Sequence, residues 1–191
     1  MSDTTSILLV GVGGQGTILA AKILTLGLLE SGYDVKMSEI HGMSQRGGSV
    51  SSHVRYGKKV YSPVIERGGA DIMVSFEQME ALRWIDYLKP GAKVIVNKQI
   101  IKPNPVLLGR AEYSDKILDA VSAAADTKTI DAIAEAKAIG NTRAVNILLM
   151  GSVVKIMQLG HIDWKSIIAK SVRPAFIEVN QKAFDKGYSL A

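Results

Sequence analysis

The beginning of the chain shows a clear order of apolar and polar positions. Residues 7–10 form a short, continuous apolar run that ends at a cluster of glycines. A broad apolar pattern of helical spacing follows for roughly 15 residues and ends at Ser31 and Gly32. This order predicts a buried strand, a tight loop and a helix. Residues 35–40 are predicted to form a second strand.

A polar, glycine-rich stretch over residues 41–48 separates the second strand from the next apolar run. We predict a third strand over residues 49–56 and a fourth over residues 60–65, with a turn at residues 57–59. The short turn predicts that these two strands pair as a β-hairpin. A doubly wound domain would have a helix in this place, so the hairpin is unusual for such a fold.

The rest of the chain returns to alternating strands and helices. Three further strands are predicted, over residues 72–76, 93–97 and 128–131. Helices are predicted over residues 77–88, 114–125, 132–139, 140–159, 163–171 and 174–186. Pro90 and Gly91 stop the first of these helices, and residues 100–105 are proline-rich and irregular. The segment at residues 140–159 is apolar on most sides, which is typical of a buried helix. This alternation predicts one α/β domain with a mixed sheet.

Composition narrows the class of protein. The chain has 191 residues, of which 47% are apolar and 21% charged, so residues 1–191 can form one domain with its own core. It has no cysteine, which excludes disulfides, a cysteine nucleophile, thiolate zinc and an iron–sulfur cluster ligated in the usual way. Any redox chemistry around this chain must therefore be carried by another molecule.

No targeting segment is apparent. The first six residues contain no basic residue, unlike a signal peptide, and no apolar stretch reaches the roughly 18 residues that a membrane-spanning helix needs. We expect a cytoplasmic protein with no membrane partner.

The glycine cluster after the first strand is the first candidate site. Its sequence fits the G-x-G-x-x-G pattern, in which glycines allow close backbone approach and a helix N-terminus favours a phosphate. Glu39 is the candidate for the acid that binds ribose in dinucleotide folds, although it lies somewhat far beyond the loop. The alternative is that the glycines only let a strand, a helix and a neighbouring chain pack closely. The residues concerned are Gly11, Gly13, Gly14, Gln15 and Gly16.

The second candidate site is the glycine-rich stretch with the strand after it. The chain has no acidic residue between Glu39 and Glu66, yet several cations lie there, and they account for most of the net charge of +5. Such an excess beside paired glycines suits a polyanion such as phosphate, and a solvated basic hairpin is the alternative. Nucleic acid suits the stretch poorly, because few aromatic residues are present for stacking. The candidate residues are His41, Ser44, Gln45, Arg46, Gly47, Gly48 and Arg55.

The third candidate site opens the apolar segment at residues 140–159 and contains Asn141, Arg143 and Asn146. Arg143 and Asn146 are three positions apart, so they share one face of a helix. Buried amide and guanidinium groups need partners, so this face meets a loop, a ligand or another subunit, or it forms a structural cap. No G-x-S-x-G or H-E-x-x-H motif is present, so we assign no catalytic residue and no metal ligand.

Together, and in this order, the motifs at residues 11–16, 38–55 and 140–146 resemble the gamma subunit or domain of 2-oxoacid:ferredoxin oxidoreductases. Residues 39–48, Glu-Ile-His-Gly-Met-Ser-Gln-Arg-Gly-Gly, look most like the indolepyruvate branch, in which this chain is called the beta subunit. The resemblance runs from about residue 6 to residue 187. It implies a single three-layer α/β/α domain, which fits the mixed, mostly parallel sheet and β-hairpin insertion expected from the pattern.

The resemblance also implies an activity: oxidative decarboxylation of a 2-oxoacid with coenzyme A to acyl-CoA, carbon dioxide and reduced ferredoxin. Thiamine diphosphate and the iron–sulfur clusters are then expected in a large partner subunit, and ferredoxin meets this chain only indirectly. This chain is expected to bind no cofactor alone. Consistently, it lacks the Gly-Asp-Gly…Asn signature of a thiamine diphosphate site.

The candidate sites and the family resemblance together suggest one mechanistic hypothesis. We expect the loop at residues 13–16 and the basic loop around Arg46 to face the catalytic subunit. There Arg46, Arg55 or Lys58 would help to hold the phosphates of coenzyme A, and a purely interfacial role is the alternative. The alternative function is a stand-alone Rossmann-like nucleotide-binding domain, NAD-linked or regulatory, and only this alternative requires Glu39 on a ribose.

Overall fold

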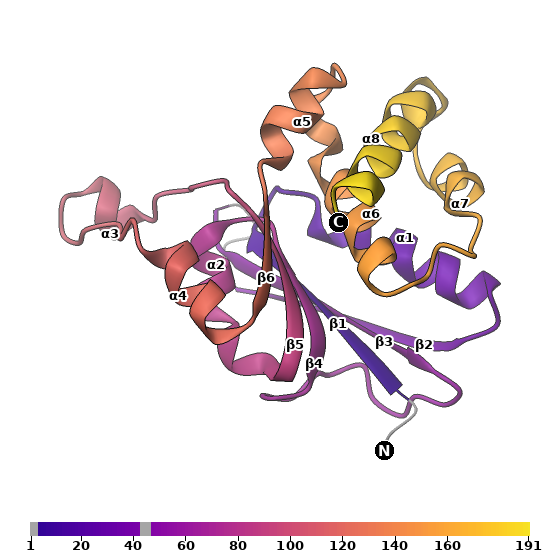
Figure 1. Cartoon of the computed structure of the whole chain (residues 1–191), viewed down its shortest axis with the longest axis horizontal. Coiled ribbons are helices and arrows are strands. Elements are labelled where there is room, and N and C mark those ends of the chain that lie inside the picture. The colour runs from indigo at the N-terminus through magenta and orange to yellow at the C-terminus, as the bar shows by residue number, and fades with distance from the viewer. Residues whose placement is uncertain (1–3, 43–46) are drawn as a thin grey trace.

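The computed structural model, which describes residues 4–42 and 47–191, contains one sheet of six strands: β1 (Thr4–Val12), β2 (Asp34–His41), β3 (Ser49–Gly57), β4 (Ala70–Ser75), β5 (Leu88–Asn97) and β6 (Asp126–Ile130). Their order across the sheet is β2-β3-β1-β4-β5-β6 (Figure 1). β1, β4, β5 and β6 run parallel, whereas β3 is antiparallel to both β1 and β2. The expected mixed, mostly parallel sheet is confirmed.

Helices cover both faces of the sheet, which confirms the three-layer α/β/α architecture (Figure 1). One face carries α2 (Gln78–Arg83) and α4 (Ile117–Ala124). The other carries α1 (Thr17–Glu30), α5 (Ala132–Ala138), α6 (Val145–Ile156), α7 (Trp164–Ser171) and α8 (Ile177–Leu190). Shorter elements are η1 (Ile85–Tyr87), α3 (Asn104–Leu107), η2 (Thr142–Ala144) and η3 (Pro174–Phe176). Within the described part of the chain, no helix has the length and apolar character needed to cross a bilayer.

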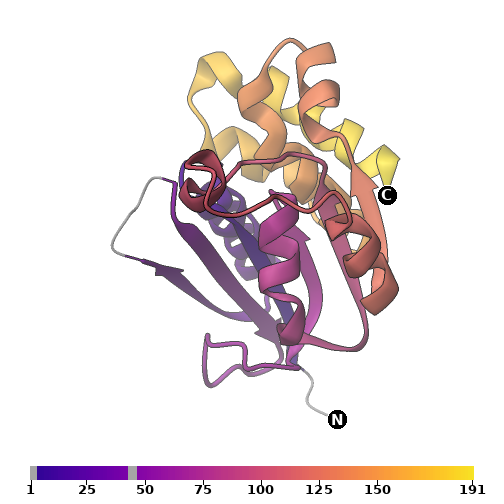
Figure 2. The ribbon, with the colours of Figure 1, turned by 90° about the vertical axis from the view of Figure 1, so that its left-hand side faces the viewer.

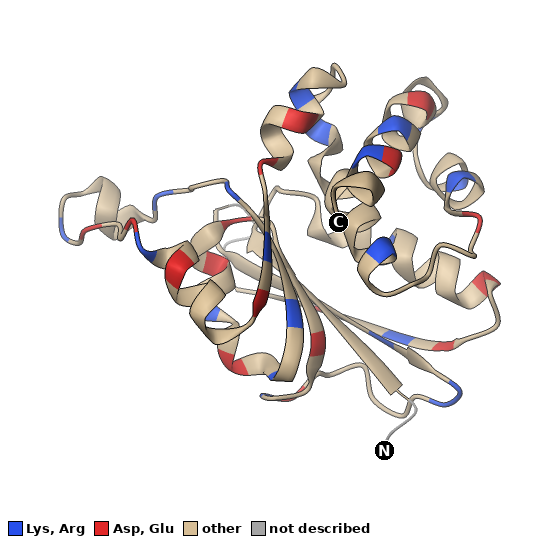
Figure 3. Ribbon diagram, in the orientation of Figure 1, with Lys and Arg blue, Asp and Glu red and all other residues tan. Residues whose placement is uncertain are grey.

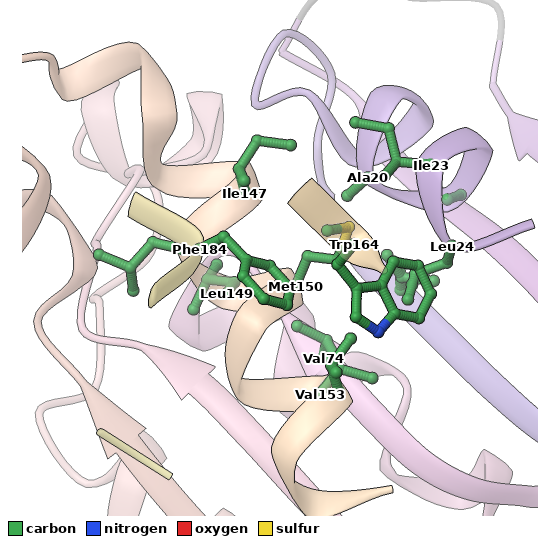
Figure 4. Close-up of a cluster of buried hydrophobic side chains, with 14 of the residues drawn as sticks. Ala20, Ile23, Leu24, Val74, Ile147, Leu149, Met150, Val153, Trp164 and Phe184 are labelled. Carbon is green, nitrogen blue, oxygen red and sulfur yellow. The ribbon is translucent and has the colours of Figure 1, made fainter. Parts of the chain in front are cut away.

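The central strands are apolar on both faces because helices cover both. In β1, Ile7 and Leu9 lie in one hydrophobic cluster and Leu8 and Val10 in the other, and all four are fully buried. Side chains of α1, α6, α7 and α8 gather in the first cluster with Val74 of β4 (Figure 4). This two-sided burial explains why the first strand reads as a continuous apolar run and not as an alternating one.

The apolar segment that opens at residue 140 forms η2 and then α6. Residues 145–154 are all buried, because α6 packs against both the sheet and α8. The two helices approach so closely that a Cβ on Gly187 of α8 would lie 1.8 Å from the Leu148 carbonyl oxygen. Ser152 Oγ donates to the Gly187 carbonyl at 2.8 Å. The expected buried helix is confirmed, and its contact with α8 requires glycine.

The predicted hairpin between residues 49–56 and 60–65 is wrong. Both edges of β3 are already paired, one with β1 and the other with β2, so no edge is free for another strand. The antiparallel hairpin of this fold is formed by β2 and β3. Residues 60–65 are held by side chains instead, since Arg55 Nη1 donates to the carbonyls of Ser62 and Val64 at 3.0 and 3.2 Å. Asp34 Oδ2 accepts from the Val60 N–H at 2.9 Å.

The helix predicted over residues 77–88 is shorter than expected, and Pro90 and Gly91 belong to a strand. α2 ends at Arg83, and β5 already begins at Leu88. The register between β4 and β5 shifts here, because Ala70 pairs with Leu88 while Ile72 pairs with Lys93. The extra residues bulge out around Gly91, whose φ of 78° suits glycine. The other predicted elements are present, with ends shifted by a few residues.

Candidate functional site

Parts of all three predicted sites meet where the parallel strands β1, β4 and β5 end. The loop after β1 exchanges backbone hydrogen bonds with the glycines before β3. The Gly13 N–H donates to the Gly48 carbonyl at 2.8 Å, and the Gly47 N–H donates to the Gly13 carbonyl at 3.2 Å. From α6, Asn146 Nδ2 donates to the Gly16 carbonyl at 3.3 Å. The crevice outside the carboxyl ends of parallel strands is the usual ligand site of α/β folds.

The glycines of the first site have different structural roles. Gly11 lies in β1 and pairs with Val50, so it belongs to the sheet. Gly14 and Gly16 have φ of 106° and 83°, which side chains rarely adopt. Gly16 directly precedes α1, and a Cβ there would lie 2.7 Å from Asn146 Nδ2. Close packing of strand, loop and helix therefore accounts for part of the glycine pattern.

The side chain of Gln15 points into the protein. Its Oε1 accepts from the Val12 N–H at 2.7 Å, and its Nε2 donates to the Phe76 carbonyl at 2.9 Å and to Gln99 Oε1 at 2.8 Å. These contacts join the loop to the ends of β1, β4 and β5. Gln15 thus positions the loop, and its amide is fully used inside the chain.

A cavity of about 390 Å³, the glycine-loop cavity, is lined by Gly13, Gly14, Gly16, Thr17, Ile18, Glu39, His41 and Val50. The nucleotide-binding alternative needs Glu39 to lie beside the glycine loop, as it does. The strand order differs from that of a dinucleotide fold, however, because β3 separates β2 from β1. This arrangement is unlike a conventional NAD site.

A second cavity of about 490 Å³, the Arg143 cavity, lies between the glycine loop and the start of α6. Gly14, Gly16, Thr142, Arg143 and Asn146 contribute to its walls. Asn141 Oδ1 caps η2 by accepting from the Arg143 N–H at 2.9 Å, so Asn141 and Asn146 both have structural hydrogen bonds. The side chain of Arg143 is exposed, and it brings a positive charge to the glycine loop.

Arg55 does not lie at this site. It pairs with Ser6 at the far end of β3, whereas Ser49 pairs with Val12 beside the loop. Six residue steps of about 3.4 Å put roughly 20 Å between these positions. Lys58 follows β3 at the same far end. The antiparallel course of β3 therefore separates two cations from the loop that precedes them in the sequence.

The second candidate site is described only in part. Ser44, Gln45 and Arg46 lie outside the described residues. His41 is exposed at the end of β2 and lines the glycine-loop cavity, while Gly47 and Gly48 join the glycine loop through the backbone.

Two buried carboxylates beside this site were missed in the sequence. Glu77 Oε1 accepts from the Ile101 N–H at 3.1 Å and from the Tyr113 hydroxyl at 3.0 Å, and its Oε2 accepts from the Glu80 N–H at 3.0 Å. Glu80 accepts from the Ser49 hydroxyl, and burial raises the pKa of its carboxyl. Both acids line a cavity of about 510 Å³, the α2 cavity, together with Gly47, Gly48 and Arg83. The available signal was the position of Glu77, directly after a predicted strand.

His53 is a buried residue of β3 and does not lie beside the glycine loop. Its Nδ1 accepts from the Ile65 N–H at 3.0 Å, which requires a neutral ring, and Nε2 lies 3.3 Å from Ser51 Oγ. Burial lowers the pKa of His53. Across residues 4–42 and 47–191, no group of three or more acidic or histidine side chains is arranged to hold a metal ion.

The chain as a whole is similar to proteins of one known family. Residues 6–190 match the family described as pyruvate ferredoxin/flavodoxin oxidoreductase. The chain is 40% identical, over 194 aligned residues, to the indolepyruvate oxidoreductase subunit IorB of Pyrococcus horikoshii, and the match covers 97% of this chain and 95% of that protein.

Solved structures share the fold. The gamma subunit of a keto/oxoacid ferredoxin oxidoreductase from Geobacter sulfurreducens superposes with a TM-score of 0.73 and 23% identity, over 98% of each chain. A 2-oxoglutarate:ferredoxin oxidoreductase from Magnetococcus marinus, solved with 2-oxoglutarate, coenzyme A and succinyl-CoA bound, superposes with a TM-score of 0.75 and 20% identity. In that protein the fold occupies 31% of a longer chain and covers 100% of this one.

Proposed function

The chain belongs to the pyruvate ferredoxin/flavodoxin oxidoreductase family, and we propose that it is the small, cofactor-free subunit of a 2-oxoacid:ferredoxin oxidoreductase that acts on indolepyruvate or a similar arylpyruvate. The observation that carries this proposal is the 40% identity to an indolepyruvate oxidoreductase subunit over nearly the whole length of both chains. The resemblance to 2-oxoglutarate synthase subunits is lower, at 29% identity, which favours the indolepyruvate branch.

In the proposed reaction, the bond between the carboxylate and the carbonyl carbon of the 2-oxoacid breaks and carbon dioxide leaves. The acyl group passes to the sulfur of coenzyme A, whose thiol proton is released, and ferredoxin accepts the two electrons of this oxidation. Thiamine diphosphate and iron–sulfur clusters in a larger partner subunit supply this chemistry. This chain has no cysteine to ligate a cluster, so its own contribution is to bind and to position.

The edge that carries the glycine loop is the surface we assign to the catalytic partner. Two cavities flank the loop, and Arg143 brings a positive charge to one of them. Backbone N–H groups at the start of α1 and a guanidinium favour anionic oxygens such as the phosphates of coenzyme A. Arg46 remains a candidate for the same role, whereas Arg55 near the far end of β3, and Lys58 just beyond that end, are too distant to share it.

The proposal is tested by purifying the tagged chain anaerobically from its host. We expect a larger iron–sulfur subunit to co-purify in stoichiometric amount, and the complex to reduce a viologen when given indolepyruvate and coenzyme A. The chain alone is expected to be inert. Purification of the chain without a larger iron–sulfur subunit, or a co-purified complex that does not reduce the viologen with indolepyruvate and coenzyme A, would contradict the proposal.

The second candidate function is a nucleotide-binding domain that acts alone. Its support is the glycine-loop cavity, where Glu39 lies beside Gly13 and Gly16. This alternative predicts that NAD binds the isolated chain at micromolar concentration and that Glu39→Gln weakens this binding. Under the subunit proposal, Glu39→Gln leaves the affinity for NAD unmeasurably low, as it is in the wild type.

A further inference from the structure

Residues 98–113, which follow β5 and precede α4, project from the rest of the molecule, and we call them the arm (Figures 1 and 2). The tip of the arm is α3 and the residue that follows it. Leu107 and Leu108 are 65% and 64% exposed, and Ile100 near the base is 51% exposed. None of the residues of α3 is buried, and none belongs to either described hydrophobic cluster. Large apolar side chains gathered on a projection mark an interaction site.

Hydrogen bonds at the base hold the arm in one position. The carboxylate of the buried Glu77 binds both ends of the arm, through the Ile101 N–H and the Tyr113 hydroxyl. The Gln78 side chain adds a bond from Nε2 to the Lys98 carbonyl at 2.6 Å, and its backbone N–H donates to the Gln99 carbonyl at 3.1 Å. Glu77, a buried acid that belongs to none of the sequence motifs, therefore anchors the arm.

The tip is ordered by its own backbone. The Val106 N–H donates to the Pro103 carbonyl at 2.9 Å, and the Leu108 N–H donates to the Asn104 carbonyl at 2.9 Å. The Arg110 N–H donates to the Pro105 carbonyl at 2.8 Å. An apolar tip that is already shaped loses little conformational entropy when it is bound.

The charge and the position of the arm favour the larger subunit as its occupant over a second copy of this chain. Lys98, Lys102 and Arg110 are exposed along the arm, where Glu112 is the acidic residue (Figure 3). A second copy of this chain, with its net charge of +5, would meet these cations with like charge. The base of the arm also lines the α2 cavity together with Gly47 and Gly48, so it is continuous with the edge assigned to the catalytic subunit.

We propose that the arm is a docking element that inserts Leu107 and Leu108 into an apolar pocket with an acidic rim on the larger subunit of the enzyme. This inference rests on the proposed function, because it takes the larger subunit as the occupant. Side chains that fill a fully desolvated pocket at the centre of an interface carry a large share of its affinity, while the surrounding cations speed association.

The test is a titration of the larger subunit with variants of this chain, followed by viologen reduction with indolepyruvate and coenzyme A. We expect the double variant Leu107→Ser, Leu108→Ser to need about tenfold more chain, or more still, to reach half of the maximal rate. The maximal rate itself should be unchanged. The matched control is the double variant Leu29→Ser, Tyr61→Ser, which removes exposed apolar side chains at the opposite end of the sheet and should leave the titration unchanged.

Each outcome is informative. If both double variants shift the curve equally, or if neither does, the arm inference is overturned while the proposed function stands. If wild-type chain forms no complex with a larger subunit, the proposed function fails and the inference fails with it. If sedimentation shows that the isolated wild type dimerises and the arm variant does not, the occupant is a second copy, and the inference is overturned. Circular dichroism should show the same melting temperature for the arm variant and the wild type.

Discussion

The side-chain amide of Asn146 lies directly against the backbone of Gly16, which is 130 positions away in the chain. Asn146 Nδ2 donates to the Gly16 carbonyl at 3.3 Å, and a Cβ on residue 16 would lie only 2.7 Å from the same nitrogen. The start of α6 therefore fixes the loop that precedes α1. Because of this contact, the two cavities beside the loop have a shared wall whose position is set by α6.

Gly16→Ala is expected to destabilise the protein more than a comparable glycine substitution elsewhere. The left-handed φ costs an alanine roughly 1–2 kcal/mol, and the contact with Asn146 adds about 1–3 kcal/mol of overpacking. The matched control is Gly32→Ala, because Gly32 has a similar φ of 87° and open space around its Cβ position. Denaturant unfolding measures both, and Asn146→Ala should relieve part of the Gly16→Ala cost in the double variant. Equal losses for the two glycine variants would contradict the steric argument.

Local sequence patterns predicted the elements well because each strand and helix is set by neighbours in the chain. The buried run at residues 7–10, the Gly-rich loop and the apolar segment that becomes α6 all have the expected form. The hairpin was wrong because strand pairing depends on which edges are free. No pattern within residues 49–65 indicates that β1 and β2 already occupy both edges of β3.

The arrangement of the site was harder to predict than the elements, because its contacts join residues that are far apart in the sequence. The residues of each motif are close together in the sequence, but their partners lie far away in the chain, such as Gln99 for Gln15, at a separation of 84 positions. Arg55 was grouped with Arg46 because the two are near in sequence, yet an antiparallel strand carries Arg55 to the far end of the sheet. Glu77 and Glu80 were missed because they lie in no recognised motif.

Gln15→Ala is expected to lower the free energy of unfolding by about 2–3 kcal/mol, because three hydrogen bonds are lost and the Val12 N–H loses its partner. Gln99→Ala removes the bond from Gln15 Nε2 and a long bond of 3.5 Å from Asn97 Nδ2, but it leaves the Val12 N–H paired, so it should cost less. Urea unfolding of the two variants provides the comparison. If Gln15→Ala were as stable as wild type but impaired in turnover, Gln15 would have a direct role in the reaction that these contacts do not suggest.

His53 is expected to make the protein less stable in mild acid. Its pKa is lowered in the folded state by burial, so below about pH 6.5 the unfolded chain takes up a proton that the folded chain does not. Stability should therefore fall as the pH drops from about 6.5 toward the lower folded pKa. His53→Gln should flatten this dependence when urea midpoints are measured between about pH 5 and pH 8. Parallel curves for the variant and the wild type would exclude His53 as the cause.

Glu80 is expected to change stability with pH in the opposite direction from His53, so that stability falls as the pH rises. Burial raises the pKa of its carboxyl above 4.5, so the folded chain keeps a proton that the unfolded chain releases as the pH rises. Its contribution to stability therefore declines as the pH rises from about 4.5 through the folded pKa. Glu80→Gln keeps an acceptor for Ser49 and should gain stability relative to wild type over this range of pH in thermal unfolding. The control is Glu178→Gln, since Lys182 lowers the pKa of Glu178 and its effect should be greatest at higher pH.

Substitutions of Arg143 and Arg55, which lie near opposite ends of the sheet, are expected to affect different properties: Arg143 affects the binding of coenzyme A, and Arg55 affects stability. Arg143 is exposed at a cavity beside the glycine loop, whereas Arg55 holds the carbonyls of Ser62 and Val64. Arg143→Ala should raise the KM for coenzyme A of the complex roughly tenfold, the loss expected for a charge-assisted hydrogen bond to a phosphate, and leave the melting temperature unchanged. Arg55→Ala should lower the melting temperature and leave that KM unchanged.

Arg46→Ala should behave like Arg143→Ala if the loop that carries it faces the same ligand. If Arg143→Ala weakens subunit association at an unchanged KM, this edge contacts the partner and not the phosphates, because the same cation then acts on assembly alone.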